Sequence, residues 1–98
     1  MSYQVRFTRE AKEDMERLHG FLVEKDLEAA RRARSALAKG VEFLRDFPYA
    51  CRKAMPDTPF LREMLVPFGH SGYVMLFEIE EKTITILAIR HQREEDYY

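Results

Sequence analysis

Residues 83–90 read Thr-Ile-Thr-Ile-Leu-Ala-Ile-Arg, and their run of apolar and β-branched side chains indicates a β-strand. A β-strand points successive side chains to opposite faces of its sheet. That period places Ile84, Ile86 and Ala88 on one face and Thr83, Thr85, Leu87 and Ile89 on the other. Since Leu87 and Ile89 are as apolar as the first face, we expect both faces to be buried and the strand to lie in the centre of a sheet.

Three more strands are expected around this one. Residues 73–80 are rich in aromatic and aliphatic side chains, and residues 60–66 alternate with period two. Proline and glycine between these strands, and charged residues at 80–82, are typical of turns. At the start of the chain, Tyr3, Val5 and Phe7 alternate with polar residues. The sequence therefore predicts a short N-terminal strand and a C-terminal antiparallel meander of three strands.

Between the first strand and the meander, the apolar period changes to that of helices. Thr8 and Asp26 suit helix N-caps, because their side-chain oxygens can accept hydrogen bonds from the free N–H groups of a first turn. Two apolar stripes follow these caps, the first at Ala11, Met15, Leu18 and Leu22, the second at Leu27, Ala30, Ala33, Leu37, Val41 and Leu44. The second helix should end before Pro48, and residues 48–59 look irregular.

These elements predict an α+β fold with the order β-αα-βββ, in which an antiparallel helical hairpin covers a small sheet. A chain of 98 residues of this kind is expected to be one domain, residues 1–98. No apolar run approaches the ~20 residues that span a bilayer, and the N-terminus has no apolar signal region. A cytoplasmic protein is therefore expected.

The composition limits the possible functions. Lys+Arg is 16 and Asp+Glu is 17, so a strongly basic clamp for nucleic acid is disfavoured. Cys51 is the only cysteine, which excludes an internal disulfide and a cysteine zinc cluster. The histidines, His19, His70 and His91, show no metal-ligand spacing. We therefore expect no metal and no cofactor.

Three segments carry a resemblance to a known family. Residues 60–64 read Phe-Leu-Arg-Glu-Met, residues 72–73 read Gly-Tyr, and residues 86–94 read Ile-Leu-Ala-Ile-Arg-His-Gln-Arg-Glu. Together with the element order, they resemble the RelE/ParE superfamily of type II toxins, often called plasmid stabilisation proteins. The resemblance implies a toxin that a cognate antitoxin, ParD-like in the ParE branch, wraps and neutralises.

The superfamily holds two activities. RelE-like members cut messenger RNA on the ribosome without a metal, and ParE-like members poison DNA gyrase. RNA cleavage needs a base, a cation for the phosphate and an acid. By resemblance, the candidates here are Arg62, His91, Arg93 and Tyr97.

Two observations favour the ParE-like activity. The lysine-rich segment of RelE-like toxins is not evident, and the chain lacks the positive charge that favours RNA binding. We therefore expect a gyrase inhibitor without chemistry of its own. The alternatives are a RelE-like endoribonuclease and a non-toxic relic that only binds its antitoxin.

Each candidate also has a structural interpretation. Arg62 could pair with Glu78 across the sheet, and His91 could form a hydrogen bond to the backbone where its strand ends. Arg93 could dock the C-terminal tail, and Tyr97 could be a packed or disordered terminal residue.

Surplus apolar side chains suggest where an antitoxin would bind. The candidates are Phe43, Phe47, Phe60 and Leu61. Such partners use helix-in-groove docking or add a strand to a sheet edge, and residues 60–66 are the predicted edge.

Overall fold

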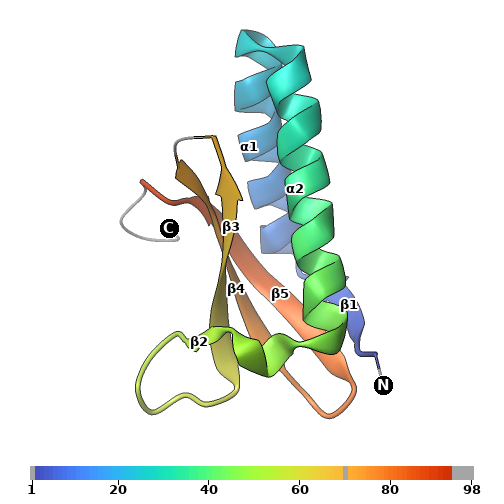
Figure 1. Ribbon diagram of the computed structural model, residues 1–98, viewed down its shortest axis with the longest axis vertical. Helices are drawn as coiled ribbons and strands as arrows, with labels where there is room; N and C mark the ends of the chain where they lie inside the picture. Colours follow the sequence, from blue (N-terminus) through green and yellow to red (C-terminus); the bar gives the residue numbers. More distant parts are fainter. Residues whose placement is uncertain (1, 70, 94–98) are drawn as a thin grey trace.

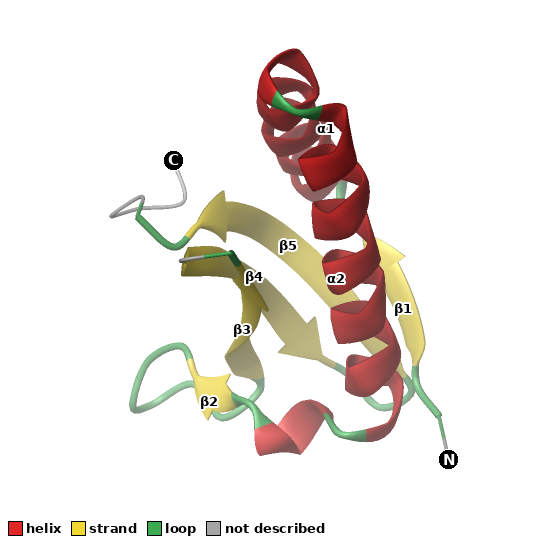
Figure 2. Ribbon diagram, turned by 45° about the horizontal axis from the view of Figure 1, so that its top comes forward, coloured by secondary structure: helices red, strands yellow, loops and turns green. Residues whose placement is uncertain are grey.

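A helical hairpin packs on one face of a five-stranded sheet (Figures 1 and 2). The computed structural model describes residues 2–69 and 71–93. The elements run β1 (Gln4–Phe7), α1 (Arg9–Lys25), α2 (Leu27–Asp46), the 3-10 turn η1 (Pro48–Ala50), β2 (Arg52–Lys53), β3 (Leu61–Phe68), β4 (Ser71–Ile79) and β5 (Thr83–His91). This order confirms the predicted α+β fold. The strand β2, two residues long, lies in the segment that the sequence predicts to be irregular.

The strand order in the sheet is β1-β5-β4-β3-β2. β1 runs parallel to β5, and the other neighbours are antiparallel. β5 therefore lies inside the sheet, as its sequence predicts. The predicted edge position of residues 60–66 is wrong at Arg62 and Glu63, because β2 pairs with both. The sequence does not predict β2, which follows η1 in the chain and pairs with β3 in the antiparallel direction.

The face assignment within β5 changes at Leu87. Leu76 pairs with Ala88 but Phe77 pairs with Ile86, so Leu87 is an extra residue in β5. Such a bulge shifts the alternation by one residue. Ile84, Ile86 and Ile89 all belong to the buried core cluster, so the predicted grouping of Ala88 with Ile84 and Ile86 is wrong. A strict period of two has no means of placing a bulge.

The caps of the two helices form as predicted. Thr8 Oγ1 accepts the Ala11 N–H at 3.1 Å. Asp26 Oδ1 accepts the N–H groups of Glu28 and Ala29, at 3.0 and 3.2 Å. The Asp26 N–H also donates to Leu22 O at 2.7 Å, closing α1. One residue thus ends α1 and begins α2, which makes the hairpin turn short.

Beyond the end of β1, the side chains of Thr8 and Asp14 form hydrogen bonds with the backbone of β5. Thr8 Oγ1 donates to Leu87 O at 3.1 Å. Asp14 Oδ2 accepts the N–H of Ile89 at 3.0 Å, and the Asp14 residue is only 6% exposed. Buried backbone groups need such partners. These bonds fix α1 against the end of β5.

The core lies between the hairpin and the sheet. Gly40 of α2 allows a close approach there, because a Cβ at this position would lie 3.1 Å from Val66 Cγ2 and 3.2 Å from Met75 Cε. The largest fully buried side chains are Phe77, Leu44, Met75, Ile84, Ile86, Ile89 and Val74. The end of the hairpin at which α1 turns into α2 projects past the sheet (Figure 1).

Candidate functional site: a groove beside the end of the sheet

A groove of about 670 Å³ lies between α1 and the neighbouring ends of β3, β4 and β5. We call it the distal groove. Its residues are Arg17, Leu18, Phe21, Leu22, Phe68, Gly69, Ser71, Tyr73, His91 and Arg93. Pockets of ~300–1,000 Å³ with mainly apolar walls and a few polar groups are the usual form of binding sites. The distal groove is therefore the leading candidate for a binding site in the part of the chain that the structure describes.

His91 is held by hydrogen bonds on both ring nitrogens. Its Nδ1 accepts the backbone N–H of Arg93 at 3.1 Å, and its Nε2 lies 3.0 Å from Ser71 Oγ. Because Nδ1 is an acceptor, the proton of the neutral ring lies on Nε2, which then donates to Ser71. The lone pair of the neutral ring is thus occupied. In this arrangement the lone pair of the neutral His91 ring faces the Arg93 N–H, and the ring presents an N–H donor to Ser71.

Aromatic rings form the floor of the distal groove. Tyr73 stacks on Phe68 with centroids 5.9 Å apart, and meets His91 edge-on at 5.8 Å. Burial raises the pKa of the Tyr73 phenol, so the neutral form is favoured. These rings therefore supply a neutral apolar surface and no negative charge.

The walls of the groove also carry positive charge. Arg17 and Arg93 line it, and the Lys25 ammonium lies 5.0 Å from the ring centroid of Phe21. Arg17 also pairs with Asp14 at 3.8 Å. The lining contains no aspartate or glutamate among the residues described. The described lining thus holds two arginines, one of which is paired with Asp14.

Arg62 has a structural role at the other end of the sheet. Its Nε donates to Pro59 O at 2.7 Å, and its Nη1 donates to Cys51 O at 2.8 Å. The guanidinium also stacks on Tyr49, 5.2 Å from the ring centroid. The expected pair with Glu78 is wrong, because the register places Arg62 opposite Phe77. The guanidinium instead ties together the two ends of the irregular segment.

The structure does not bring the four nuclease candidates together. Arg62 pairs with Phe77 and His91 pairs with Tyr73, four residues apart on β4. That offset is about 13 Å along a strand. Arg93 joins His91 in the distal groove. Tyr97 lies outside the described residues.

None of the four apolar candidates for antitoxin binding is among the residues that line the distal groove. Phe43 of α2 and Phe47, the C-cap of that helix, are exposed neighbours with ring centroids 5.4 Å apart. Phe60 is 56% exposed and shares a small hollow with Tyr49. Leu61 follows Phe60 and is partly buried. These residues form exposed apolar surface, and their role in antitoxin binding stays a prediction.

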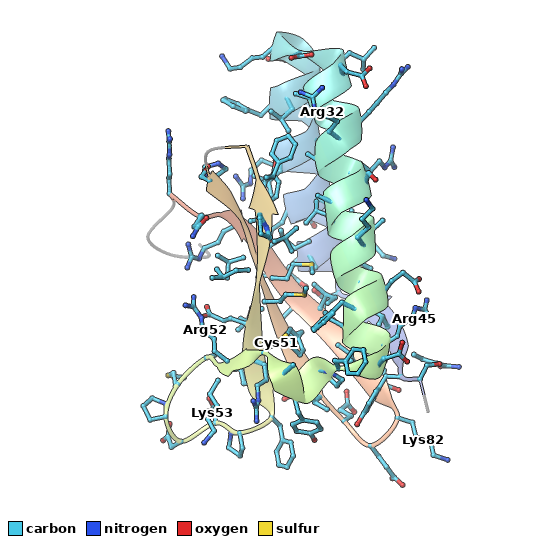
Figure 3. The ribbon with its side chains drawn as sticks, viewed as in Figure 1. Arg32, Arg45, Cys51, Arg52, Lys53 and Lys82 are labelled. Carbon is cyan, nitrogen blue, oxygen red and sulfur yellow. The ribbon has the colours of Figure 1, made fainter. Side chains whose placement is uncertain are left out.

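Cys51, labelled in Figure 3, accepts the hydrogen bond from Arg62 Nη1 through its backbone oxygen. Burial raises the pKa of its thiol, and the positive charge of Arg62 lowers that pKa in part. The neighbouring Arg52 pairs with Glu63, with both nitrogen–oxygen distances at 3.2 Å. A thiol with a raised pKa is a poor nucleophile near neutral pH.

Two absences hold for residues 2–69 and 71–93. None of their His, Cys, Asp and Glu side chains gather in a group of three or more that could hold a metal ion. No helix in this part of the chain is long and apolar enough to cross a membrane.

Sequence reasoning missed Arg17, Phe21 and Phe68 as members of a site. The sequence could have indicated Phe21, because this aromatic residue lies outside the apolar stripe of α1. The structure leaves it 61% exposed. A large exposed aromatic residue on a helix can indicate a contact with a partner. Phe68 and Arg17 carried no such signal, since only the tertiary fold brings them to Phe21.

Two solved structures share this fold. One is a chain of the chromosomal ParDE toxin–antitoxin system from P. aeruginosa, at 20% identity and a TM-score of 0.71, covering 92% of this chain and 96% of that one. The other belongs to the toxin–antitoxin complex RelBE2 from Mycobacterium tuberculosis, at 24% identity and a TM-score of 0.59, covering 94% and 100%. The fold is therefore that of proteins found in type II toxin–antitoxin complexes.

The family follows from the sequence matches. The family described as ParE toxin of the type II toxin–antitoxin system parDE matches residues 5–96. A curated relative, Toxin RelE1 from Caulobacter vibrioides, is 33% identical over 95 residues, which cover 97% of this chain and 99% of the relative. The chain belongs to the ParE toxin family, within the RelE/ParE superfamily.

Proposed function

We propose that the chain is a cytoplasmic toxin that inhibits DNA gyrase by binding it, and that a ParD-like antitoxin neutralises it. The family match over residues 5–96 carries this proposal. The similar P. aeruginosa structure is that of a ParDE toxin–antitoxin system, which supports an antitoxin of the ParD kind as the partner. Binding, rather than bond breaking, is the activity that the described side chains suit.

The geometry of the nuclease candidates supports a toxin without chemistry. The guanidinium of Arg62 donates hydrogen bonds to the backbone carbonyl groups of Pro59 and Cys51. The lone pair on Nδ1 of the neutral His91 ring accepts a hydrogen bond from the Arg93 N–H. A general base must have a free lone pair within reach of the proton that it takes. Among the described residues, these two candidates therefore provide neither a free phosphate-binding cation nor a base.

The test of this proposal is a supercoiling assay. Purified toxin is titrated into gyrase, relaxed plasmid and ATP. We expect inhibition of supercoiling that premixing with the cognate antitoxin relieves. Unimpaired supercoiling at every toxin concentration would contradict the proposal.

A ribosome-dependent endoribonuclease is the second candidate. The name of the 33% identical relative, Toxin RelE1, favours it. Cleavage would then have to use Arg93 or residues outside those described. Toxin added to an in vitro translation reaction would cut the messenger in this case, and intact messenger would exclude it. A non-toxic relic would leave both assays unchanged and would still bind its antitoxin.

A further inference from the structure

We propose that a pocket between α1 and α2 binds a small amphipathic anion, with an alkyl chain between the helices and a carboxylate at the rim. The pocket has a volume of about 250 Å³, and we call it the interhelical pocket. It is distinct from the distal groove, because Leu18, Leu22 and Tyr73 line both and stand between them. This inference goes beyond the proposed function and does not depend on it.

The walls of the interhelical pocket are apolar, and α2 contributes small side chains to them. Ala30 and Ala33 are buried, at 0% and 4% exposed, and they lie across the pocket from longer side chains of α1. The apolar walls consist of Met15, Leu18, Leu22, Ala30, Ala33 and Leu37. An apolar cavity of ~150 Å³ lined by such side chains takes up a molecule as large as benzene. A pocket of about 250 Å³ therefore has room for a short alkyl chain.

The pocket stays open because separate contacts hold each helix on the sheet. Asp14 of α1 accepts the Ile89 N–H of β5 at 3.0 Å. α2 approaches β3 and β4 at Gly40, where a Cβ would lie 3.1 Å from Val66 Cγ2 and 3.2 Å from Met75 Cε. A cavity persists where the structure around it relaxes only in part. The sheet thus fixes the spacing of the two helices, and the alanines leave space between them.

The rim of the pocket favours an anionic head group. Lys12 of α1 and Arg34 of α2 contribute two positive charges, against one carboxylate from Glu16. His19 also lines the pocket and adds no negative charge. The ion pairs among the described residues involve none of these side chains, so their charges are available to a ligand. A carboxylate accepts charge-assisted hydrogen bonds from an ammonium and a guanidinium, whereas an alkylammonium ion would meet like charges.

Calorimetric titration of the full-length protein with octanoate tests the proposal near neutral pH. Octylammonium is the matched cation, and octanoate should bind at least tenfold more tightly. Burial of one methylene group raises affinity about fourfold, so octanoate should also bind about tenfold more tightly than hexanoate. With the methionine methyl groups labelled for NMR, the Met15 signal should shift on binding. The signal of Met55, which is exposed and does not line the pocket, should not shift.

Three variants locate the ligand. A33L places a larger side chain in the pocket and should weaken octanoate binding at least tenfold, with a circular dichroism spectrum like that of the wild type. The K12E/R34E double variant reverses two charges at the rim and should invert the preference, so that octylammonium binds more tightly than octanoate. R32E reverses a charge on α2 outside the pocket (Figure 3) and should change octanoate affinity less than twofold.

Several results would overturn the proposal. Equal binding of octanoate and octylammonium would refute the selection by charge. Octanoate binding that persists in folded A33L, or that leaves the Met15 signal unmoved, would refute the assignment to this pocket. Since Lys12 and Arg34 are exposed, an unchanged preference in K12E/R34E refutes the proposal even where A33L does not fold. Self-association of the protein that A33L abolishes would make a second copy the occupant.

Discussion

Replacing Asp14 by alanine should destabilise the fold, because this buried side chain of α1 bonds to the backbone of β5. The Asp14 residue is 6% exposed, and its carboxylate accepts the N–H of the fully buried Ile89 at 3.0 Å. The D14A variant leaves that N–H without a partner. An orphaned buried donor costs ~1–3 kcal/mol, and hydrogen bonds to charged groups contribute ~1.5–3 kcal/mol.

We expect D14A to lose about 2 kcal/mol in the free energy of unfolding. For a domain of this size, that corresponds to a fall in Tm of about 8–16 °C. Urea denaturation followed by circular dichroism measures the free energy, and hydrogen exchange at the Ile89 amide reports the lost bond. The D14N variant keeps an oxygen acceptor and should lose less than half as much.

The matched control is E13A, one residue earlier. Glu13 is exposed and pairs with the exposed Arg9 at 3.3 Å, so its removal should cost no more than about 0.5 kcal/mol. Burial of a carboxylate is itself costly, and replacing it by an apolar group can be neutral or stabilising. A D14A variant as stable as E13A would therefore refute the view that Asp14 holds α1 to β5.

Three further predictions test other parts of the molecule. The G72A variant should lose about 1–3 kcal/mol in the free energy of unfolding, because its Cβ would overlap the carbonyl oxygen of Val66. The G20A variant, with no atom near its Cβ, should gain ~0.5–1 kcal/mol. Equal urea midpoints of the two variants would contradict both predictions. Because burial raises the pKa of Cys51, the native state keeps the thiol proton to higher pH than the unfolded chain does. The free energy of unfolding should therefore fall as pH rises past 9.0, and it should fall less steeply in the C51A variant. Identical slopes of stability against pH in the two proteins from pH 8 to 10 would count against the burial of the thiol. The R62K variant keeps the charge but loses the forked hydrogen bonds, so proteolysis within residues 54–60 should be faster while toxicity is retained; lost toxicity in a folded R62K protein would instead favour a phosphate-binding role.

The elements could be predicted from the sequence because each has a local cause. Thr8 and Asp26 cap helices through hydrogen bonds to residues two and three positions away. Residues 83–90 indicate a central strand because both of their faces are apolar. Periodicity and capping act within a few residues, so a single sequence is enough to reveal them.

The features that escaped prediction depend on contacts between distant residues. The bulge at Leu87 depends on how β5 meets β4. The bonds of Arg62 to Cys51 and Pro59 depend on the path of the irregular segment. The distal groove joins Phe21 of α1 to Phe68 of β3, 47 positions apart in the chain. Local patterns carry no information about such pairings, which explains why sequence reasoning puts Arg62 beside Glu78.

The central claim is that the toxin acts by binding gyrase. The most direct measurement is induced expression in a bacterial host, with plasmid supercoiling and messenger RNA examined in the same cells. We predict relaxed or cleaved plasmid DNA and intact messenger, with growth restored by the antitoxin. Messenger cut within codons, in cells whose plasmids remain normally supercoiled, would contradict the account and direct attention to Arg93 and to the residues outside those described.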